Sequence, residues 1–272
     1  MRGMTTWTEI ADGVFVRRYR FFDQNIVAVI DRGEALVVDT RSTYRQAREI
    51  IEDLCEIGAP RVVAVVNTHG HFDHAFGNRI FRPAPIWGHE RAADMLAPGG
   101  GQRELAAAEL PRLADELLGV ELDPPDRRFL DTATVVVGER RVDLAYFGRG
   151  HTDNDIVLTV EHADVLVVGD LLENGATPYF GDGFPLDWPT TAAAILARTD
   201  DDTVVVPGHG DHAGRAFVER QAGEVAANAT LARLVHAGVL DLEAAIAASP
   251  YPADAAREPL ERALAQLRGE LD

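Results

Sequence analysis

Two segments of this chain, 25–39 and 155–169, align with each other without a gap although they lie in different halves of the sequence. Each places two apolar runs rich in Val and Ile on either side of a short polar turn. This pattern is typical of two buried antiparallel strands joined as a hairpin. The chain therefore contains an internal repeat, which limits the folds that it can adopt.

The repeat continues beyond the hairpins. A helical stretch, 44–57, and a buried strand, Val62–Val66, follow the first copy, and a helical stretch, 189–198, and a buried strand, Thr203–Val206, follow the second. The order strand, strand, helix, strand thus occurs twice. This duplication predicts two similar sheets that pack face to face, with helices on their outer sides. We therefore expect an α+β fold, a four-layer αββα sandwich built from two similar halves.

The rest of the chain extends this plan. We expect one catalytic domain over 1–212 and a C-terminal helical extension over 213–272, packed on the same domain and interrupted at Ser249–Pro252. A Gly-rich break at 98–101 precedes an Ala- and Leu-rich stretch, Glu104–Leu118, which predicts one amphipathic helix acting as a lid or substrate wall.

Composition restricts the partners of the protein. The 272 residues carry 44 acidic and 26 basic side chains, a net charge of −18, so their field repels polyanions and anionic lipid surfaces. We expect a small-molecule substrate, no long nucleic acid and no membrane partner, and a homo-oligomer is compatible with the sequence. The single cysteine, Cys55, is assigned to the apolar helix face as inert core. Without an intrachain disulfide or an apolar leader, the expected location is the cytoplasm.

The densest chemical signal is His69-Gly70-His71-Phe72-Asp73-His74, directly after a predicted strand. Neutral imidazoles and carboxylates are the ligands that borderline-soft divalent ions prefer, and a turn at a strand end directs alternate side chains into one cavity. The alternative, that the three histidines cap the next helix in solvent, explains this spacing poorly.

Three further candidates lie singly at predicted strand boundaries: His151, Asp170 and His209. Alone, each is better explained as a solvated turn residue. The His-Gly phrases at His69 and His209 occupy equivalent strand ends of the repeat, which predicts that they face each other across one rim of the sandwich.

In this order the residues resemble the metallo-β-lactamase superfamily, whose pattern is His-x-His-x-Asp-His, then His, then a bridging Asp or Cys, then His. The resemblance runs from about Val14 to Gly210, and the ligand set is complete. It implies that His69, His71 and His151 hold one metal ion, that Asp73, His74 and His209 hold the second, and that Asp170 bridges them. It also implies a role for Asp73 in orienting the attacking water.

Such a centre implies two divalent ions, zinc in the first place, with iron or manganese as alternatives. Two ions lower the pKa of a shared water, so a metal-bridging hydroxide forms at neutral pH. Support from outside the ligand set is expected from Asp39, Thr68 and Thr152, although an Asp at a strand end is more often a turn or capping residue.

The loop 171–188 is the predicted substrate rim. Its candidate residues are Glu173, Tyr179, Phe180 and Trp188, and aromatic side chains there suit an apolar or neutral substrate. The alternative, that the aromatics only pack the loop down, is equally consistent with the sequence.

Departures from related patterns indicate the reaction. Glu173 stands where secreted class B β-lactamases of this layout place a Lys, and a carboxylate there repels an anionic drug. Glyoxalase II enzymes hold glutathione with basic residues, and 171–202 contains no Lys. We predict a binuclear hydrolase that cleaves a small ester, lactone, thioester or amide. The alternatives are a mononuclear iron oxidoreductase of persulfide dioxygenase type and a phosphodiesterase acting on small nucleotides.

Overall fold

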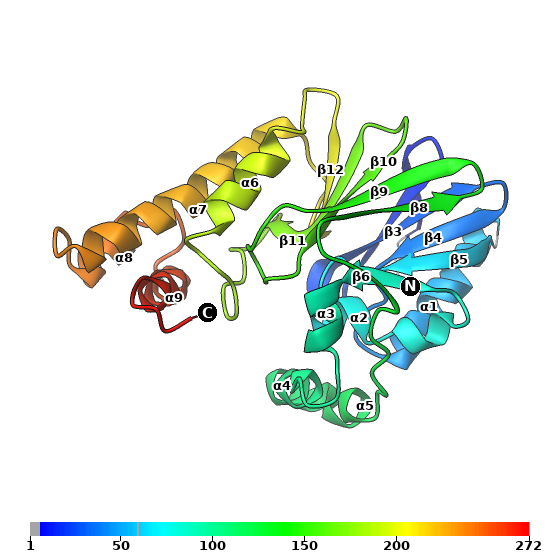
Figure 1. Ribbon diagram of the computed structural model, residues 1–272, viewed down its shortest axis with the longest axis horizontal. Coiled ribbons are helices and arrows are strands. Elements are labelled where there is room, and N and C mark those ends of the chain that lie inside the picture. Colours follow the sequence, from blue (N-terminus) through cyan, green and yellow to red (C-terminus); the bar gives the residue numbers. More distant parts are fainter. Residues whose placement is uncertain (1–5, 59, 272) are drawn as a thin grey trace. The chain divides into compact units, whose positions relative to one another are not determined.

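Both hairpins expected from the repeat are present in the computed structural model, which describes residues 6–58 and 60–271 (Figure 1). In the first, β3 (Gln24–Asp31) pairs antiparallel with β4 (Glu34–Val38). In the second, β10 (Ile156–Val160) pairs antiparallel with β11 (Val165–Glu173). The first turn has positive φ at both of its central residues, as tight hairpins require.

The chain packs into two compact units. Unit 1 contains the described residues up to Tyr146 together with 156–167. Unit 2 contains 147–155 together with the described residues from Val168 onward. The boundary between the units therefore passes through β11.

The first sheet of unit 1 mixes antiparallel and parallel pairing. Its other strands are β1 (Thr8–Ala11), β2 (Val14–Tyr19), β5 (Arg61–Val66), β6 (Ile86–His89) and β7 (Arg127–Phe129). The order is β7-β6-β5-β4-β3, with β2 and β1 following β3. Strands β4 to β7 are parallel, so their carboxyl ends lie along one edge. The residues just after β4 and β5 are thereby brought together.

Helix α1 (Tyr44–Leu54) covers one face of this sheet. Thr43 caps the helix, because its hydroxyl oxygen accepts a 3.3 Å hydrogen bond from the Gln46 backbone N–H. Buried residues of the helix and of five strands form one core cluster, which includes Ala47, Ile50, Leu54, Tyr19, Ile26, Ala28, Val37, Val65 and Ile86. Burial of this apolar face is the main stabilisation of an 11-residue helix.

Cys55 is exposed, so its assignment to the core was wrong. Helix α1 ends at Leu54, and the chain continues as a 3-10 turn, η2 (Cys55–Ile57), which ends at Gly58 with φ 96°. The tighter turn changes the helical period and takes the Cys55 side chain off the packed face.

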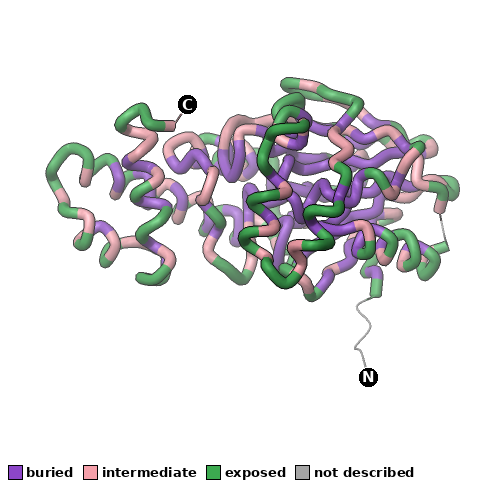
Figure 2. The backbone as a smooth tube through the Cα atoms, turned by 90° about the horizontal axis from the view of Figure 1, so that it is seen from below, coloured by how far each residue is buried: buried purple, intermediate pink, exposed green. Residues whose placement is uncertain are grey.

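The second sheet of unit 1 is antiparallel. Strand β8 (Thr132–Val137) pairs with β9 (Arg140–Tyr146), and β9 pairs with β10. Strand β8 lies against β3, β4 and β5. Val135 and Val137 are buried while Val136 is exposed, the alternation of a strand with one covered face. Helix α1 and the two sheets form three of the predicted layers. Most residues of β3, β4 and β10 are buried, and Figure 2 colours the buried backbone purple.

Unit 2 contains the end of β11, strand β12 (Val204–His209) and four helices. These are α6 (Trp188–Leu196), α7 (Arg215–His236), α8 (Leu242–Ala248) and α9 (Arg257–Leu267). Helix α6 packs on α7, and the last three helices share a small core of Ala232, Ala245, Leu260 and Ala263. The predicted C-terminal helices and their interruption at Ser249–Pro252 are confirmed.

The predicted helix Glu104–Leu118 is wrong as a single element. The chain forms α4 (Gln102–Glu109), a 3-10 turn η4 (Pro111–Leu113) and α5 (Ala114–Leu118). Pro111 lacks the N–H that a continuous helix needs, so the helix ends before it. The remaining short elements are η1 (Phe21–Asp23), α2 (Phe72–Ala75), η3 (Asn78–Phe81) and α3 (Glu90–Met95).

No helix in the described part of the chain combines the length and the apolar character needed to span a membrane.

The packing of α1 gives a matched test. Ile50 is fully buried and its neighbour Ile51 is 40% exposed. We expect Ile50→Ala to lower the free energy of unfolding by about 2–5 kcal/mol, because it leaves a cavity against the sheet. Ile51→Ala is expected to change it by less than about 1 kcal/mol. Urea denaturation followed by circular dichroism measures both, and equal losses would show that α1 does not pack as described.

Candidate metal centre

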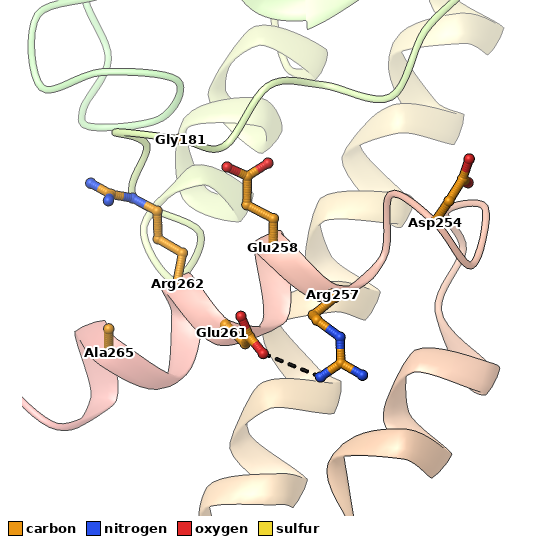
Figure 3. A pocket seen from close by; sticks show the side chains of 7 residues that line it. All are labelled: Gly181, Asp254, Arg257, Glu258, Glu261, Arg262 and Ala265. Carbon is orange, nitrogen blue, oxygen red and sulfur yellow. Dashed lines mark hydrogen bonds and ion pairs between the residues drawn. The ribbon is translucent and has the colours of Figure 1, made fainter.

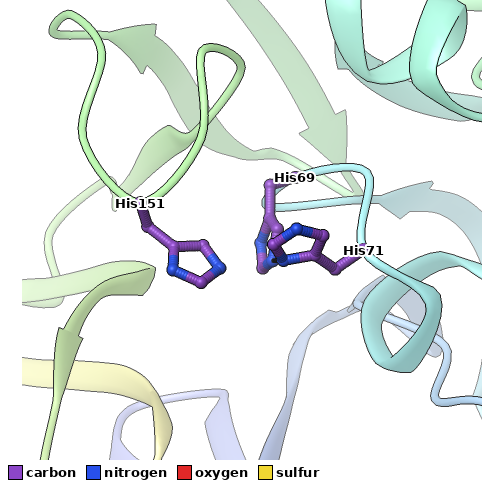
Figure 4. A group of neighbouring side chains, drawn as sticks. All are labelled: His69, His71 and His151. Carbon is purple, nitrogen blue, oxygen red and sulfur yellow. Dashed lines mark hydrogen bonds between the residues drawn. The ribbon is translucent and has the colours of Figure 1, made fainter. Parts of the chain in front are cut away.

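The His-rich motif occupies the turn between β5 and α2 in unit 1. Gly70 packs closely there, because a Cβ at this position would lie 2.8 Å from the Met95 sulfur and the Met95 side chain would have to shift. The turn brings His69 and His71 together, with 3.0 Å between His69 Nε2 and His71 Nδ1. In Figure 4 both side chains come from this turn, while His151 comes from the loop before β10.

Asp39 lies at the end of β4, beside the end of β5. Its φ of 65° is in the left-handed region and turns the chain at the strand end. One carboxylate oxygen accepts a hydrogen bond from the Thr68 N–H, and the other accepts one from the Thr68 hydroxyl, each at 2.8 Å. His74 Nδ1 lies 2.8 Å from the same second oxygen. Parallel pairing of β4 with β5 makes this convergence possible.

These contacts determine which imidazole nitrogens carry protons. The single hydroxyl proton of Thr68 goes to Asp39, so its oxygen accepts from His69 Nδ1–H at 3.1 Å. His74 Nδ1–H donates to Asp39. The Nε2 atoms of His69 and His74 therefore keep their lone pairs, which is the state that a metal ligand needs.

Burial and hydrogen bonding act on Asp39 in opposite directions. Burial raises the pKa of its carboxyl group, whereas the hydrogen bonds from His74 and Thr68 favour the ionised form. Three donors on one carboxylate hold the two histidines in fixed orientations.

Other buried contacts hold the second part of the motif. Gln24 donates its side-chain amide to the Asp73 carbonyl. Asn67 Nδ2 and the Thr40 N–H donate to the His74 carbonyl at 3.0 and 2.8 Å. As a result, Asp73 Oδ2 lies 3.4 Å from His74 Nε2, and the two form a second pair of donors.

Unit 2 carries the other three candidates. His151 Nδ1 lies 3.1 Å from the Tyr179 carbonyl oxygen, which can only accept, so Nδ1 holds the proton and Nε2 the lone pair. Asp170 Oδ2 lies 3.6 Å from His151 Nε2 and 3.3 Å from His209 Nε2. All three side chains are buried. The Asp170 carboxylate thus lies beside the donor nitrogens of two histidines.

Gly208 makes room for this carboxylate. A Cβ at this position would overlap Asp170 Oδ1. Strand β12 lies next to β11, so the backbone of Gly208 passes directly beside Asp170. A glycine before His209 is therefore a packing requirement of the site.

Thr152, expected to support the ligands, makes its described hydrogen bonds within its own loop. Its N–H donates to Asp155 Oδ2 at 2.6 Å, and its hydroxyl oxygen accepts from the Asn154 N–H at 3.0 Å. These bonds shape the turn that follows His151.

The predicted rim residues lie in different environments. Tyr179 is 44% exposed and Glu173 is half-buried. Phe180 and Trp188 are fully buried, with ring centroids 4.8 Å apart. Phe180 and Trp188 therefore fit the alternative that the aromatics only pack the loop down, because they expose almost no surface.

Sequence reasoning missed Phe22. This residue adopts φ 58° between β2 and β3, is 41% exposed, and has its ring 5.8 Å from Phe72 of the His-rich motif. The available signal was the adjacent pair Phe21-Phe22 between two strands, followed later by an aromatic inside the ligand motif. Unit 1 thus has a pair of aromatic rings that joins the turn before β3 to the His-rich motif.

The donor set suits a divalent metal. All seven predicted ligands belong to groups of His and Asp side chains that could hold a metal ion. The 3.0 Å between His69 Nε2 and His71 Nδ1 is close to the roughly 3.3 Å expected between two nitrogens bound tetrahedrally to one zinc ion. Imidazole and carboxylate ligands fit zinc, iron and manganese.

Asp39 gives the first test of the centre. We expect Asp39→Asn to lower metal affinity about 10–100-fold, because it disturbs the hydrogen bonds that orient His69 and His74. Asp31→Asn, at the end of the neighbouring strand β3, is the control and is expected to keep the wild-type affinity. Competition with a chelator measures both, and an unchanged affinity in Asp39→Asn would contradict the assigned role.

Gly208 gives the second test. Gly208→Ala is expected to displace the Asp170 carboxylate and to lower metal affinity by more than about tenfold. Gly214→Ala is the control, since a Cβ there has only the Thr203 carbonyl oxygen near it, at 4.0 Å. Elemental analysis after dialysis compares the two variants. Equal metal retention would show that Asp170 tolerates a Cβ at 208.

Comparisons with known proteins identify the family of this chain. The family model described as "Metallo-beta-lactamase superfamily" matches residues 19–209. A type 2 metallo-beta-lactamase from Bacteroides fragilis is 30% identical over 224 residues, which cover 78% of this chain and 82% of the relative. A human acyl-coenzyme A thioesterase is 24% identical over 226 residues, covering 74% of this chain and 79% of the relative.

A solved metallo-beta-lactamase from Pontibacter korlensis matches with a TM-score of 0.64 at 19% identity, covering 82% of this chain and all but 1% of that structure. This likeness confirms the predicted α+β fold class. Together with the family model, which spans most of the chain, it places the sequence in a known family. The chain belongs to the metallo-β-lactamase superfamily of metal-dependent hydrolases.

Proposed function

We propose that this protein is a two-metal hydrolase that cleaves a small, uncharged ester, thioester, lactone or amide. The observation that carries the proposal is the position of Asp170 within unit 2. Its Oδ2 lies within 3.6 Å of His151 Nε2 and within 3.3 Å of His209 Nε2. A carboxylate between two imidazole donors is suited to bridge two ions, each bound by one of the histidines.

The donor pairs of unit 1 support the same assignment. His69 and His71 form one pair, and Asp73 and His74 form the other. We propose that the first pair would hold one ion together with His151, that the second pair would hold the other together with His209, and that Asp170 would serve both. Zinc is the proposed metal, because it combines readily with imidazole and carboxylate ligands and needs no redox chemistry for hydrolysis.

When bound, two such ions supply a hydroxide at neutral pH and stabilise negative charge that develops on the scissile group. The chain positions the donors. Asp39 and Thr68 keep the protons of His69 and His74 on Nδ1, and the Tyr179 carbonyl does the same for His151. Asp73, held by Gln24 through its carbonyl, is proposed to orient the attacking water with its carboxylate.

Charge and rim composition indicate a neutral substrate. The net charge of −18 repels large anions. Phe22 and Tyr179 offer exposed aromatic surface. The human relative is named as an acyl-coenzyme A thioesterase, which supports an acyl thioester among the candidate bonds.

Metal analysis and a substrate panel test this function. We expect two zinc equivalents per chain in protein purified without added metal, and hydrolysis of at least one ester, thioester, lactone or amide. Asp170→Asn is expected to reduce that rate at least about 100-fold, since it removes the bridging charge. Asp164→Asn, in the turn before β11, is the control and is expected to keep the rate.

Two results would contradict the proposal. Two bound zinc ions without hydrolysis of any member of the panel would remove the proposed reaction. One iron per chain with oxygen uptake would indicate an oxidoreductase instead.

A further inference from the structure

Two depressions lie on the described surface of unit 2. The first runs along α9, and among its lining side chains Arg257 forms an ion pair with Glu261 (Figure 3). Arg257 binds Glu261 and Glu243, and Arg262 Nε donates to the Gly183 carbonyl at 2.6 Å.

The second depression is a cavity of about 310 Å³, here called the α7 cavity. Its wall is formed by the loop 173–178, by one face of α7 with Phe217, Arg220, Gln221 and Glu224, and by Pro250, Tyr251 and Pro252. The volume is at the lower end of the range for small-molecule sites.

Its wall is rigid. The Gln221 side chain binds the backbone of Glu173 twice, accepting from its N–H and donating to its carbonyl, each at 2.8 Å. The Asn174 N–H donates to the His209 carbonyl at 3.1 Å, and two prolines flank Tyr251. A cavity held in this way exists before a ligand arrives, which lowers the entropy cost of binding.

The α7 cavity is separate from the proposed metal centre. Glu173 follows Asp170 by three residues, about 10 Å along a strand, and side chains an odd number of residues apart leave opposite faces of a strand. A ligand in this cavity therefore meets the far side of β11, away from the Asp170 carboxylate.

Two of its polar side chains lack a strong partner. Tyr251 is 6% exposed, and its buried hydroxyl has no hydrogen-bond partner among the described residues. Burial and the nearby Glu224 carboxylate raise the pKa of Tyr251, so the hydroxyl keeps its proton at neutral pH and remains a donor. An unmatched buried hydroxyl is costly, and a ligand acceptor would remove that cost.

Glu224 supplies the charge. Burial raises the pKa of its carboxyl group, and its ion pair with Arg220 is long, 3.8 Å from Nε to Oε1. An ammonium group within the cavity would be a closer partner for the carboxylate. The rings of Phe217 and Tyr251 and two prolines form apolar walls that suit a compact hydrocarbon body.

We propose that the α7 cavity binds a small organic amine that also carries a hydrogen-bond acceptor, with Glu224 holding the ammonium group and the Tyr251 hydroxyl donating to the acceptor. The site is independent of the proposed hydrolysis. Asn174 lines the cavity, and its N–H donates to the His209 carbonyl. A ligand in the cavity would therefore lie next to the segment that carries His209, a proposed metal ligand.

Titration calorimetry with the metal-loaded protein tests this site with three matched probes. These are 2-amino-1-phenylethanol, 2-phenylethylamine, which lacks the hydroxyl group, and 1-phenylethanol, which lacks the amine. We expect the first to bind most tightly and 1-phenylethanol to bind about tenfold more weakly, as expected for the loss of one charge-assisted hydrogen bond.

The variants separate the two contacts. Glu224→Gln is expected to abolish the tighter binding of 2-amino-1-phenylethanol relative to 1-phenylethanol. Tyr251→Phe is expected to abolish its tighter binding relative to 2-phenylethylamine. Tyr251→Phe removes an unmatched group, so it is expected to fold, which thermal denaturation checks. Glu219→Gln, on α7 but outside the cavity lining, is the control and is expected to bind like wild type. Equal affinities for the three probes, or no saturable binding, would overturn the proposal. Unchanged amine binding by Glu224→Gln would also overturn it, because that result is expected if the amine coordinates the metal instead.

Discussion

The Asp39 carboxylate, with three hydrogen-bond donors, is the interaction on which the unit 1 part of the site depends. It accepts from the Thr68 backbone, the Thr68 hydroxyl and His74 Nδ1, each at 2.8 Å. Because the Thr68 proton is committed to Asp39, His69 has to donate Nδ1–H to Thr68. One buried carboxylate thus sets the protonation of two predicted ligands. Parallel pairing of β4 and β5 places it there, since both strands end at the same edge.

Unit 2 reaches the same chemical result by different means. A backbone carbonyl, that of Tyr179, sets the proton on His151, and a missing side chain at Gly208 makes room for Asp170. The two units therefore prepare their donors with separate networks. The α7 cavity lies wholly within unit 2 and depends on none of these donors.

Much of the fold followed from the repeat in the sequence. The hairpins at 25–39 and 155–169 and the strand and helix after each were predicted from apolar patterns, and they are present. The errors arose where local sequence is ambiguous. Glu104–Leu118 has helical composition throughout, but Pro111 divides it. Cys55 continues the apolar period of α1, but the helix tightens into a 3-10 turn and exposes it.

By itself the sequence determined the donor types and their spacing, because three imidazoles and a carboxylate in six residues at a strand end leave few alternatives to a metal site. It also determined the class of fold, through the repeat. Only the tertiary structure decided which atoms those donors present, since a tautomer depends on contacts such as Asp39 with His74 that join distant segments. It also decided that Phe180 and Trp188 are packing residues and that Phe22 lies near Phe72. Burial and contact between distant residues are properties of the folded chain, and no local pattern contains them.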